Sequence, residues 1–182
     1  MKLLATGYLL KDRAKRGFTL LELLVVIGVI TIVGVIAADI FVNVTRSYNK
    51  AEIIARVQRS GNATLSQMTG EIRNSRRVVS PAPGSSDSSL MIEDSSGNQV
   101  EFSFTPPDET NNGFVSRNGA AISDSDFSTG VNVTSLVFTV LDTDPTVVGI
   151  SIALEQPLGA GGRIDFQADV TLQTSVSLRT YE

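Results

Sequence analysis

The feature of this 182-residue chain that most restricts its fold is a 21-residue apolar stretch near the N-terminus, residues 18–38. Glu22 is the only charged residue in that stretch. A helix of this length spans about 30 Å, the thickness of the hydrocarbon core of a bilayer. The sequence therefore predicts a membrane-spanning helix, and it raises the question of why such a helix contains a carboxylate.

The charges on either side of this stretch are unequal. Residues 1–17 contain five basic side chains and one acid, whereas Arg46 and Lys50 are the only basic residues in the fifteen positions after Ala38. Basic residues beside a membrane helix favour its cytoplasmic side. The sequence therefore predicts a single-pass protein with its N-terminus in the cytoplasm and its C-terminal mass outside.

Two explanations of the apolar stretch follow from the residues. An ordinary secretory signal peptide would be cleaved close to Ala37 or Ala38, but the apolar cores of such peptides have only about 7 to 15 residues. A charged residue inside a membrane helix costs about 2.5 to 3.5 kcal/mol on insertion scales and usually marks a function. The residues by themselves leave both a simple signal or anchor and a functional helix open.

The ten residues KRGFTLLELL, positions 15–24, resemble the prepilin motif of type IV pilins and type II secretion pseudopilins. In that family a membrane-embedded prepilin peptidase cuts after the glycine and methylates the new N-terminal residue. The resemblance implies cleavage between Gly17 and Phe18, followed by N-methylation of Phe18. It also implies that Glu22, the fifth residue of the mature chain, pairs with the N-terminal amine of a neighbouring subunit.

Electrostatics is consistent with this role for Glu22. An unpaired carboxylate in hydrocarbon is unfavourable, and an opposite charge nearby relieves the penalty. After cleavage the obvious cation at that depth is the amine of Phe18, and methylation keeps its charge. The amine can come from the same helix or from an adjacent helix shifted along the axis. In the second case Glu22 would select the correct stagger between subunits.

The helical pattern is predicted to continue beyond the membrane segment to about residue 79. Gly61 and Gly70 are points where the helix could bend, and Pro81 prevents further helix. The stripe from residue 54 to residue 72 is predicted to lie across a sheet. Apolar or small residues recur at three- and four-residue steps, at Ile40, Val44, Ala51, Ile54, Val57, Gly61, Leu65, Met68 and Ile72.

From residue 80 onward the apolar period changes to alternation. A segment rich in Pro, Gly and Ser at 80–89 is predicted to be a linker. Apolar and polar residues then alternate around Phe102, around Ile150, and from Phe166 to Leu178. This pattern is typical of antiparallel strands with one buried face. Turns between the strands are predicted at 94–98, 116–121 and 142–146.

The predicted fold class is α+β, with a long N-terminal helix packed on a C-terminal antiparallel sheet, and the pilin resemblance implies the same architecture. The predicted segments are a leader at 1–17, a transmembrane and assembly segment at 18–38, an amphipathic continuation of the helix at 39–79, and a β-sheet head at 80–182.

Beyond the N-terminal motif the resemblance is looser. The segments VQRSGNATLSQMTGEIRNSRRVV and VSLRTYE resemble minor pilins and pseudopilins of the J or W kind. The chain lacks the C-terminal disulfide of many major pilins, and Asp39 stands where many of them have a helix-kinking proline. These departures favour a minor pilin or pseudopilin over the bulk fibre subunit.

The composition argues against an enzyme and against a metal centre. The chain has no histidine and no cysteine, so it lacks the commonest general base, the commonest metal ligand and any thiolate. No cofactor is expected. Three pairs of acids could gather oxygen ligands for Ca²⁺, but none has the full spacing of a calcium loop, and solvated turn residues are the preferred interpretation. These pairs are Asp108 with Glu109, Asp124 with Asp126, and Asp142 with Asp144.

The charge of the head bears on its partners. Residues 80–182 contain three arginines and fourteen acids, a net charge of −11, whereas proteins bind phosphate backbones through cationic contacts. Direct nucleic-acid binding is therefore not expected. The resemblance implies other partners, namely prepilin peptidase, other pilin or pseudopilin subunits, the inner-membrane assembly machinery and the lipid bilayer.

Two functions follow from the sequence. The first is a non-enzymatic structural subunit of a type IV pilus or type II secretion pseudopilus, held in the bacterial inner membrane as a precursor and then assembled into a filament at the cell surface or in the periplasm. The alternative is a secreted or membrane-anchored β-rich domain with binding or hydrolytic activity and an ordinary signal or anchor segment. A mature chain that begins at methylated Phe18 supports the first, and one that begins at Ala38 or Asp39 supports the second.

Overall fold

The computed structural model describes residues 17–160 and 168–179. Most of the predicted leader and Phe166 therefore lie outside the described residues. The chain divides into two compact units, one ending at Asn43 and one beginning at Val44. The first unit contains the apolar part of a long helix, and the second contains the rest of that helix and all the strands.

Helix α1 extends from Leu20 to Arg73, so the predicted end near residue 79 is wrong. The Asn74 amide donates to the carbonyl of Gly70 at 3.0 Å, and the Ser75 hydroxyl donates to the carbonyl of Ile72 at 2.7 Å. These side chains satisfy carbonyl groups that the last turn leaves without intrahelical partners. The β-branched residues after them then form strand β1, Arg77–Ser80, instead of more helix.

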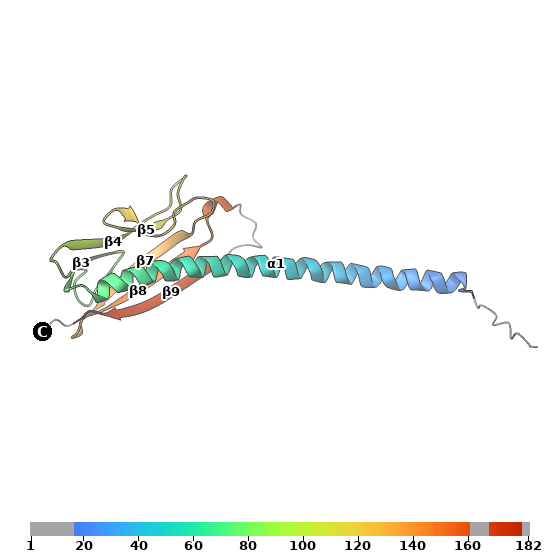
Figure 1. The fold of residues 1–182 in the computed structure, drawn as a ribbon, viewed down its shortest axis with the longest axis horizontal. Coiled ribbons are helices and arrows are strands. Elements are labelled where there is room, and N and C mark those ends of the chain that lie inside the picture. Colours follow the sequence, from blue (N-terminus) through green and yellow to red (C-terminus); the bar gives the residue numbers. More distant parts are fainter. Residues whose placement is uncertain (1–16, 161–167, 180–182) are drawn as a thin grey trace, which may run out of the picture. The chain divides into compact units, whose positions relative to one another are not determined.

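The strands form two antiparallel sheets, which confirms the α+β prediction but divides the expected single sheet (Figure 1). The five-stranded sheet has the order β1-β3-β4-β5-β6, and the four-stranded sheet has the order β2-β7-β8-β9. Besides β1, the first contains β3 (Ser89–Glu93), β4 (Gln99–Thr105), β5 (Phe114–Arg117) and β6 (Ala120–Ala121). The second contains β2 (Ser86–Asp87), β7 (Asn132–Leu141), β8 (Val147–Glu155) and β9 (Asp169–Ser177).

The alternation that predicted the strands is confirmed where the structure describes it. In β8 the even-numbered residues from Val148 to Leu154 are buried, and the odd-numbered ones are less so. In β9 every exposed residue is odd-numbered. The segment 80–89 is not wholly a linker, because Ser86 and Asp87 pair with Thr139 and Phe138 of β7.

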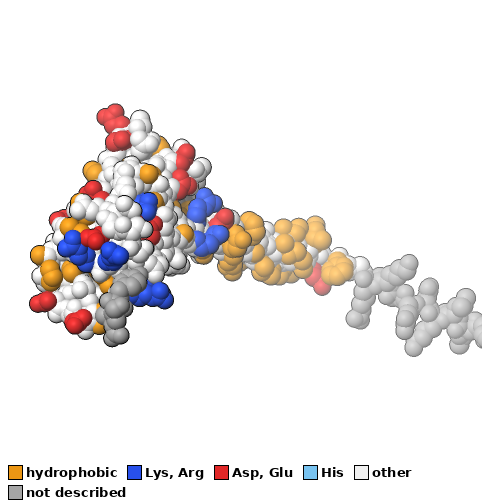
Figure 2. All heavy atoms as spheres, turned by 60° about the vertical axis from the view of Figure 1, so that its left-hand side comes forward, with side chains coloured by type: hydrophobic (Ala, Val, Ile, Leu, Met, Phe, Trp, Pro, Cys, Tyr) orange, Lys and Arg blue, Asp and Glu red, His pale blue; other side chains and the backbone are white. Residues whose placement is uncertain are grey.

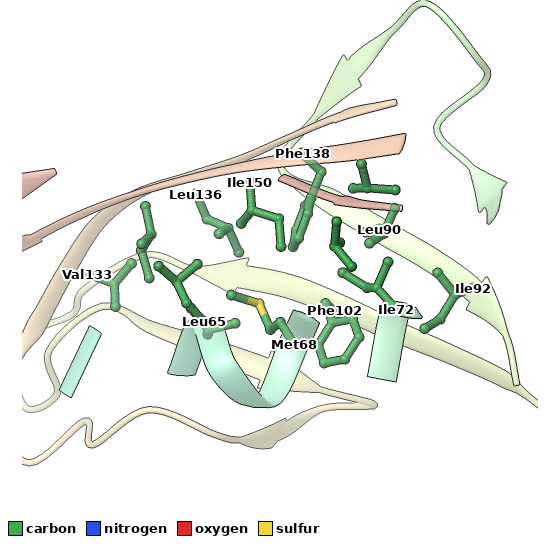
Figure 3. Close-up of a cluster of buried hydrophobic side chains, with 14 of the residues drawn as sticks. Leu65, Met68, Ile72, Leu90, Ile92, Phe102, Val133, Leu136, Phe138 and Ile150 are labelled. Carbon is green, nitrogen blue, oxygen red and sulfur yellow. The ribbon is translucent and has the colours of Figure 1, made fainter. Parts of the chain in front are cut away.

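The core of the second unit lies between the C-terminal half of α1 and both sheets. Figure 3 shows Leu65, Met68 and Ile72 of α1 lying among side chains of both sheets, including Phe102 of β4 and Phe138 of β7. Met68, Ile72 and both phenylalanines are fully buried. The predicted packing of residues 54–72 on a sheet is confirmed, and the stripe covers two sheets at once.

Gly61 has a packing role that the sequence pattern of the helix did not reveal. It is buried, and a Cβ on it would overlap the Cδ1 atom of Leu154 in β8 and would lie 2.6 Å from the Cδ1 atom of Leu172 in β9. Glycine therefore allows the helix backbone to approach this sheet closely. A Cβ on Gly70 would meet no atom within 4 Å, and α1 remains helical through both positions.

Candidate functional site at the start of the helix

The start of α1 is fixed by Thr19. The Glu22 N–H donates to the Thr19 hydroxyl oxygen at 3.2 Å, and the Leu23 N–H donates to the Thr19 carbonyl oxygen at 3.2 Å. Thr19 is thus the N-cap, and a threonine followed three residues later by glutamate is a recognised helix-start signal. Thr19 was missed as a functional residue, although this spacing could have identified it.

The predicted site residues lie together at this end of the chain. Gly17 and Phe18 precede the helix, and Glu22 lies in its first turn. Phe18 exposes 79% of its surface. The bond predicted to be cleaved is therefore in non-helical backbone, directly before the capped turn that contains the acid.

Glu22 has no charged partner within its own described chain. No ion pair joins its carboxylate to any residue that the structure describes. A carboxylate near a helix N-terminus gains about 0.3 to 1 kcal/mol from the helix dipole, less than the cost of about 2.5 to 3.5 kcal/mol for a charge in a membrane helix. In a membrane the dipole would therefore offset only part of that cost.

Gly17 is not required by the fold. A Cβ at this position would meet no atom within 4 Å. Glycine is therefore not needed at this position for close packing against the described residues. A requirement for glycine at 17 must come from something outside the described chain.

The apolar side chains of the first unit face outward. From Phe18 to Val42 the large apolar residues each expose between 44% and 82% of their surface, and Figure 2 shows hydrophobic side chains covering most of the visible face of this part of the helix. Helix α1 is long and apolar enough to cross a membrane, and none of its most apolar part is buried by the protein. An unburied apolar surface of this extent requires lipid or other helices as its surroundings.

In two of the three acid pairs considered for calcium, an aspartate carboxylate accepts hydrogen bonds within its own loop. The Asp108 carboxylate accepts hydrogen bonds from the amides of Thr110 and Asn111, both at 2.7 Å. These bonds, that of Thr110 first, lower the pKa of Asp108 from 3.8 to about 2. The amide of Thr129 leads a similar set of bonds that lowers the pKa of Asp126. Within the described residues no group of three or more acids is placed to hold a metal ion.

Comparison with known proteins identifies the N-terminal segment. The family model described as the prokaryotic N-terminal methylation motif matches residues 12–38. No curated protein and no solved structure matches the chain. The matched residues include Gly17, Phe18 and Glu22, and the motif is typical of type IV pilins and pseudopilins. The chain therefore combines an N-terminal methylation motif with a pilin-like α+β fold, a long helix packed on antiparallel sheets.

Proposed function

We propose that the chain is a structural, non-enzymatic subunit of a type IV pilus or a type II secretion pseudopilus. The observation that carries the proposal is the methylation motif at the start of a helix whose first half is apolar on all sides and whose second half is part of a head core. One half of α1 is suited to lipid and to other helices, and the other half holds the head. This arrangement fits a protein that is first held in a membrane as a precursor and is later assembled into a helical filament.

Processing is the first step of the proposal. Prepilin peptidase cuts between Gly17 and Phe18 in the inner membrane, with residues 1–17 as a cytoplasmic leader, and methylates the new N-terminus. The non-helical backbone at Gly17 and Phe18 supports this step, because a peptidase binds extended substrate backbone more readily than a hydrogen-bonded helix. Thr19 supports it too, since its cap keeps the helix from extending into the cleavage site.

Assembly is the second step. The Glu22 carboxylate, which lacks a charged partner in its own described chain, pairs with the amine of Phe18 in an adjacent subunit. A subunit in the wrong stagger would leave both charges in hydrocarbon, which is unfavourable by a few kcal/mol. Glu22 therefore selects the stagger, and residues 18 to about 53 form the bundle of the filament.

Within this class, the chain fits a minor pilin or pseudopilin better than the bulk fibre subunit. The absence of cysteine and the presence of Asp39 on a helix without proline support that assignment. The assembly partners are other pilin or pseudopilin subunits and the inner-membrane assembly machinery. The alternative function, a secreted or anchored β-rich domain, needs an ordinary cleavage site near Ala38.

The mature N-terminus tests the proposal. The full chain is produced in a bacterium that has a prepilin peptidase, and the mature protein is examined by intact-mass and N-terminal peptide mass spectrometry. The expected N-terminus is Phe18 with one added methyl group, and a strain without the peptidase should contain only the precursor. A chain that begins at Ala38 or Asp39 in both strains would establish the secreted alternative instead.

A further inference from the structure

Two arginines of the acid-rich head form ion pairs with glutamates of the same chain. Arg77 in β1 pairs with Glu93 in β3 at 2.8 Å. Arg117 in β5 pairs with Glu71 of α1 at 2.7 Å, which ties the five-stranded sheet to the helix. Because these arginines already have carboxylate partners, they are not free to bind another acid.

Arg76 and Arg179 differ from these paired arginines. Neither forms an ion pair with any residue that the structure describes, and both are exposed. They line one hollow of about 480 Å³, together with Arg77 and with the apolar side chains of Pro145 and Leu178. Figure 2 shows several basic side chains near one another on one face of the head. We call the hollow bounded by Arg76, Arg77 and Arg179 the arginine cleft.

The backbone positions of Arg76 and Arg179 are fixed. The Arg76 N–H donates to the carbonyl of Glu93 at 2.8 Å, and the Arg179 N–H donates to the carbonyl of Arg73 at 3.2 Å. Arg76 is thereby held to the five-stranded sheet, and Arg179 is held to the end of α1. Two guanidinium groups that start from fixed points lose less entropy on binding a ligand than two groups on flexible loops do.

The helix dipole does not account for the whole cleft. Cations near a helix C-terminus are favourable, which explains Arg73 in the last turn of α1. Arg179 follows β9, more than one hundred residues later in the chain, and it reaches the same place only through the fold. Asp144 also lines the hollow but pairs with none of the described arginines.

We propose that the arginine cleft binds carboxylate side chains on the head of an adjacent subunit. Guanidinium groups match carboxylates with two parallel hydrogen bonds, and the apolar wall formed by Pro145 and Leu178 reduces the screening of that attraction by water. Heads of this kind supply the ligand, since residues 80–182 of this chain carry fourteen acids. The identity of the partner rests on the proposed filament function, whereas the binding of carboxylate does not.

The charge of the rest of the head favours a short acidic protein surface over a nucleic acid. A nucleic acid extends its phosphates well beyond a single cleft and would meet the acids that dominate residues 80–182. A few carboxylates on a facing head can contact the cleft alone. The cleft therefore favours ligands whose negative charges are confined to a short segment.

Binding of an acidic peptide tests the cleft on the full chain in a non-ionic detergent. The probe is a fluorescent hexaglutamate peptide, followed by anisotropy, with hexaglutamine and a short DNA duplex as comparators. The wild type should bind hexaglutamate, and binding should weaken as salt rises from about 0.05 to 0.5 M because the contact is ionic. The double variant Arg76→Ala, Arg179→Ala should bind at least about tenfold more weakly.

A matched variant controls for net charge. Gln99→Glu with Gln173→Glu lowers the net charge by two, as the arginine double variant does, but at exposed positions outside the cleft. It should bind hexaglutamate as the wild type does, and the variant with lysine at 76 and 179 should bind with intermediate affinity. Three results would each overturn the proposal. They are an equal loss of hexaglutamate affinity in the Gln99→Glu, Gln173→Glu control, no loss of affinity in the arginine double variant, and tighter binding of DNA than of hexaglutamate.

A second readout separates this proposal from the proposed function. In cells that supply the other filament subunits, Glu22→Leu should be depleted in sheared filaments, yet in detergent it should still bind hexaglutamate. The arginine double variant should lose peptide binding and enter filaments less efficiently than the glutamine control. Normal incorporation of Glu22→Leu into filaments would count against the assembly role of Glu22 without affecting the proposal that the cleft binds carboxylates. Normal incorporation of the arginine double variant would refute the contact between the cleft and an adjacent subunit.

Discussion

At the scale of single residues, Gly17 allows a clean test of processing because the fold places no demand on it. We expect Gly17→Val to leave full-length precursor in the inner membrane, since a large β-branched residue crowds the backbone that the peptidase must bind. Gly34→Ala is the matched control, because Gly34 also has open space around it, and it should be processed normally. The measurement is the ratio of precursor to mature band on a gel. A normal mature band for Gly17→Val would argue against the prepilin assignment.

Glu22 separates processing from assembly. We expect Glu22→Leu to be cleaved and inserted at least as well as the wild type, because leucine is far more favourable than a charged residue in hydrocarbon. It should nevertheless be depleted in the sheared filament fraction, since the amine of the neighbouring subunit loses its partner. Glu22→Asp, which keeps the charge, should recover part of the incorporation. Accumulation of uncleaved Glu22→Leu would instead assign the acid to the peptidase reaction.

At the scale of elements, the two glycines of the C-terminal half of α1 should respond in opposite directions. Gly61→Val should destabilise residues 45–182 by about 1 to 3 kcal/mol, because the new side chain collides with Leu154 and Leu172 in a packed core. Gly70→Ala should stabilise them by up to about 1 kcal/mol, because alanine is the better helix former and the space is open. Urea unfolding of the two variants measures both signs. A stable Gly61→Val variant would show that the helix does not approach the sheet so closely.

The loop after β4 should give a pH-dependent contribution through Asp108. Hydrogen bonds from Thr110 and Asn111 lower the pKa of its carboxyl group from 3.8 to about 2 in the folded chain. The ionised form is thus favoured by folding, so its contribution is complete above pH 3.8 and disappears as the pH falls through about 2. Asp108→Asn should reduce the free energy of unfolding at neutral pH and match the wild type near pH 2. A difference between Asp108→Asn and the wild type that stays the same from neutral pH to below pH 2 would contradict this contribution.

The elements also show what the sequence could and could not predict. The membrane segment, the stripe from Val57 to Ile72 and the strands β4 and β8 were readable because each keeps one period. Strand β7 was missed because its pairing with β8 shifts between Val133 and Ser135, so the buried residues change from odd to even positions. The division into two sheets depends on pairings between distant strands, which no local period encodes.

The candidate site was predictable to a similar degree. Gly17, Phe18 and Glu22 lie within six positions of the sequence, so a local motif could specify them, and the family model covers the same residues. The N-cap Thr19 was readable from its spacing to Glu22 but was overlooked. The arginine cleft could not be predicted, because Arg76 and Arg179 come together only through the topology of the sheets.

At the scale of the whole molecule, deletion should show that the head includes the C-terminal half of α1. We expect the fragment 45–182 to be soluble, monomeric and rich in strand, because it lacks the apolar segment but keeps the helix that covers the core. The fragment 84–182 should aggregate, since it exposes the sheet surfaces against which Leu65, Met68 and Ile72 pack. The fragment 75–182, which retains β1, is the matched control and should aggregate as well. Circular dichroism and gel filtration provide the measurement, and a stable 75–182 fragment would contradict the fold.

The hydrogen bond from the Arg179 N–H to the Arg73 carbonyl has a consequence for exchanging parts between such proteins. It brings the two ends of the strand-bearing segment to one point of the helix, and segments with adjacent ends are the ones most readily transplanted. A chimera joined at residues 73 and 179 would nevertheless fail, because the acceptor helix would present the wrong side chains to the transplanted sheets. The compatible junction lies before Val57, the first fully buried residue of α1. A head can therefore be exchanged as a unit only when it brings with it its own last part of α1, from before Val57 to Arg73, which is about five turns of helix.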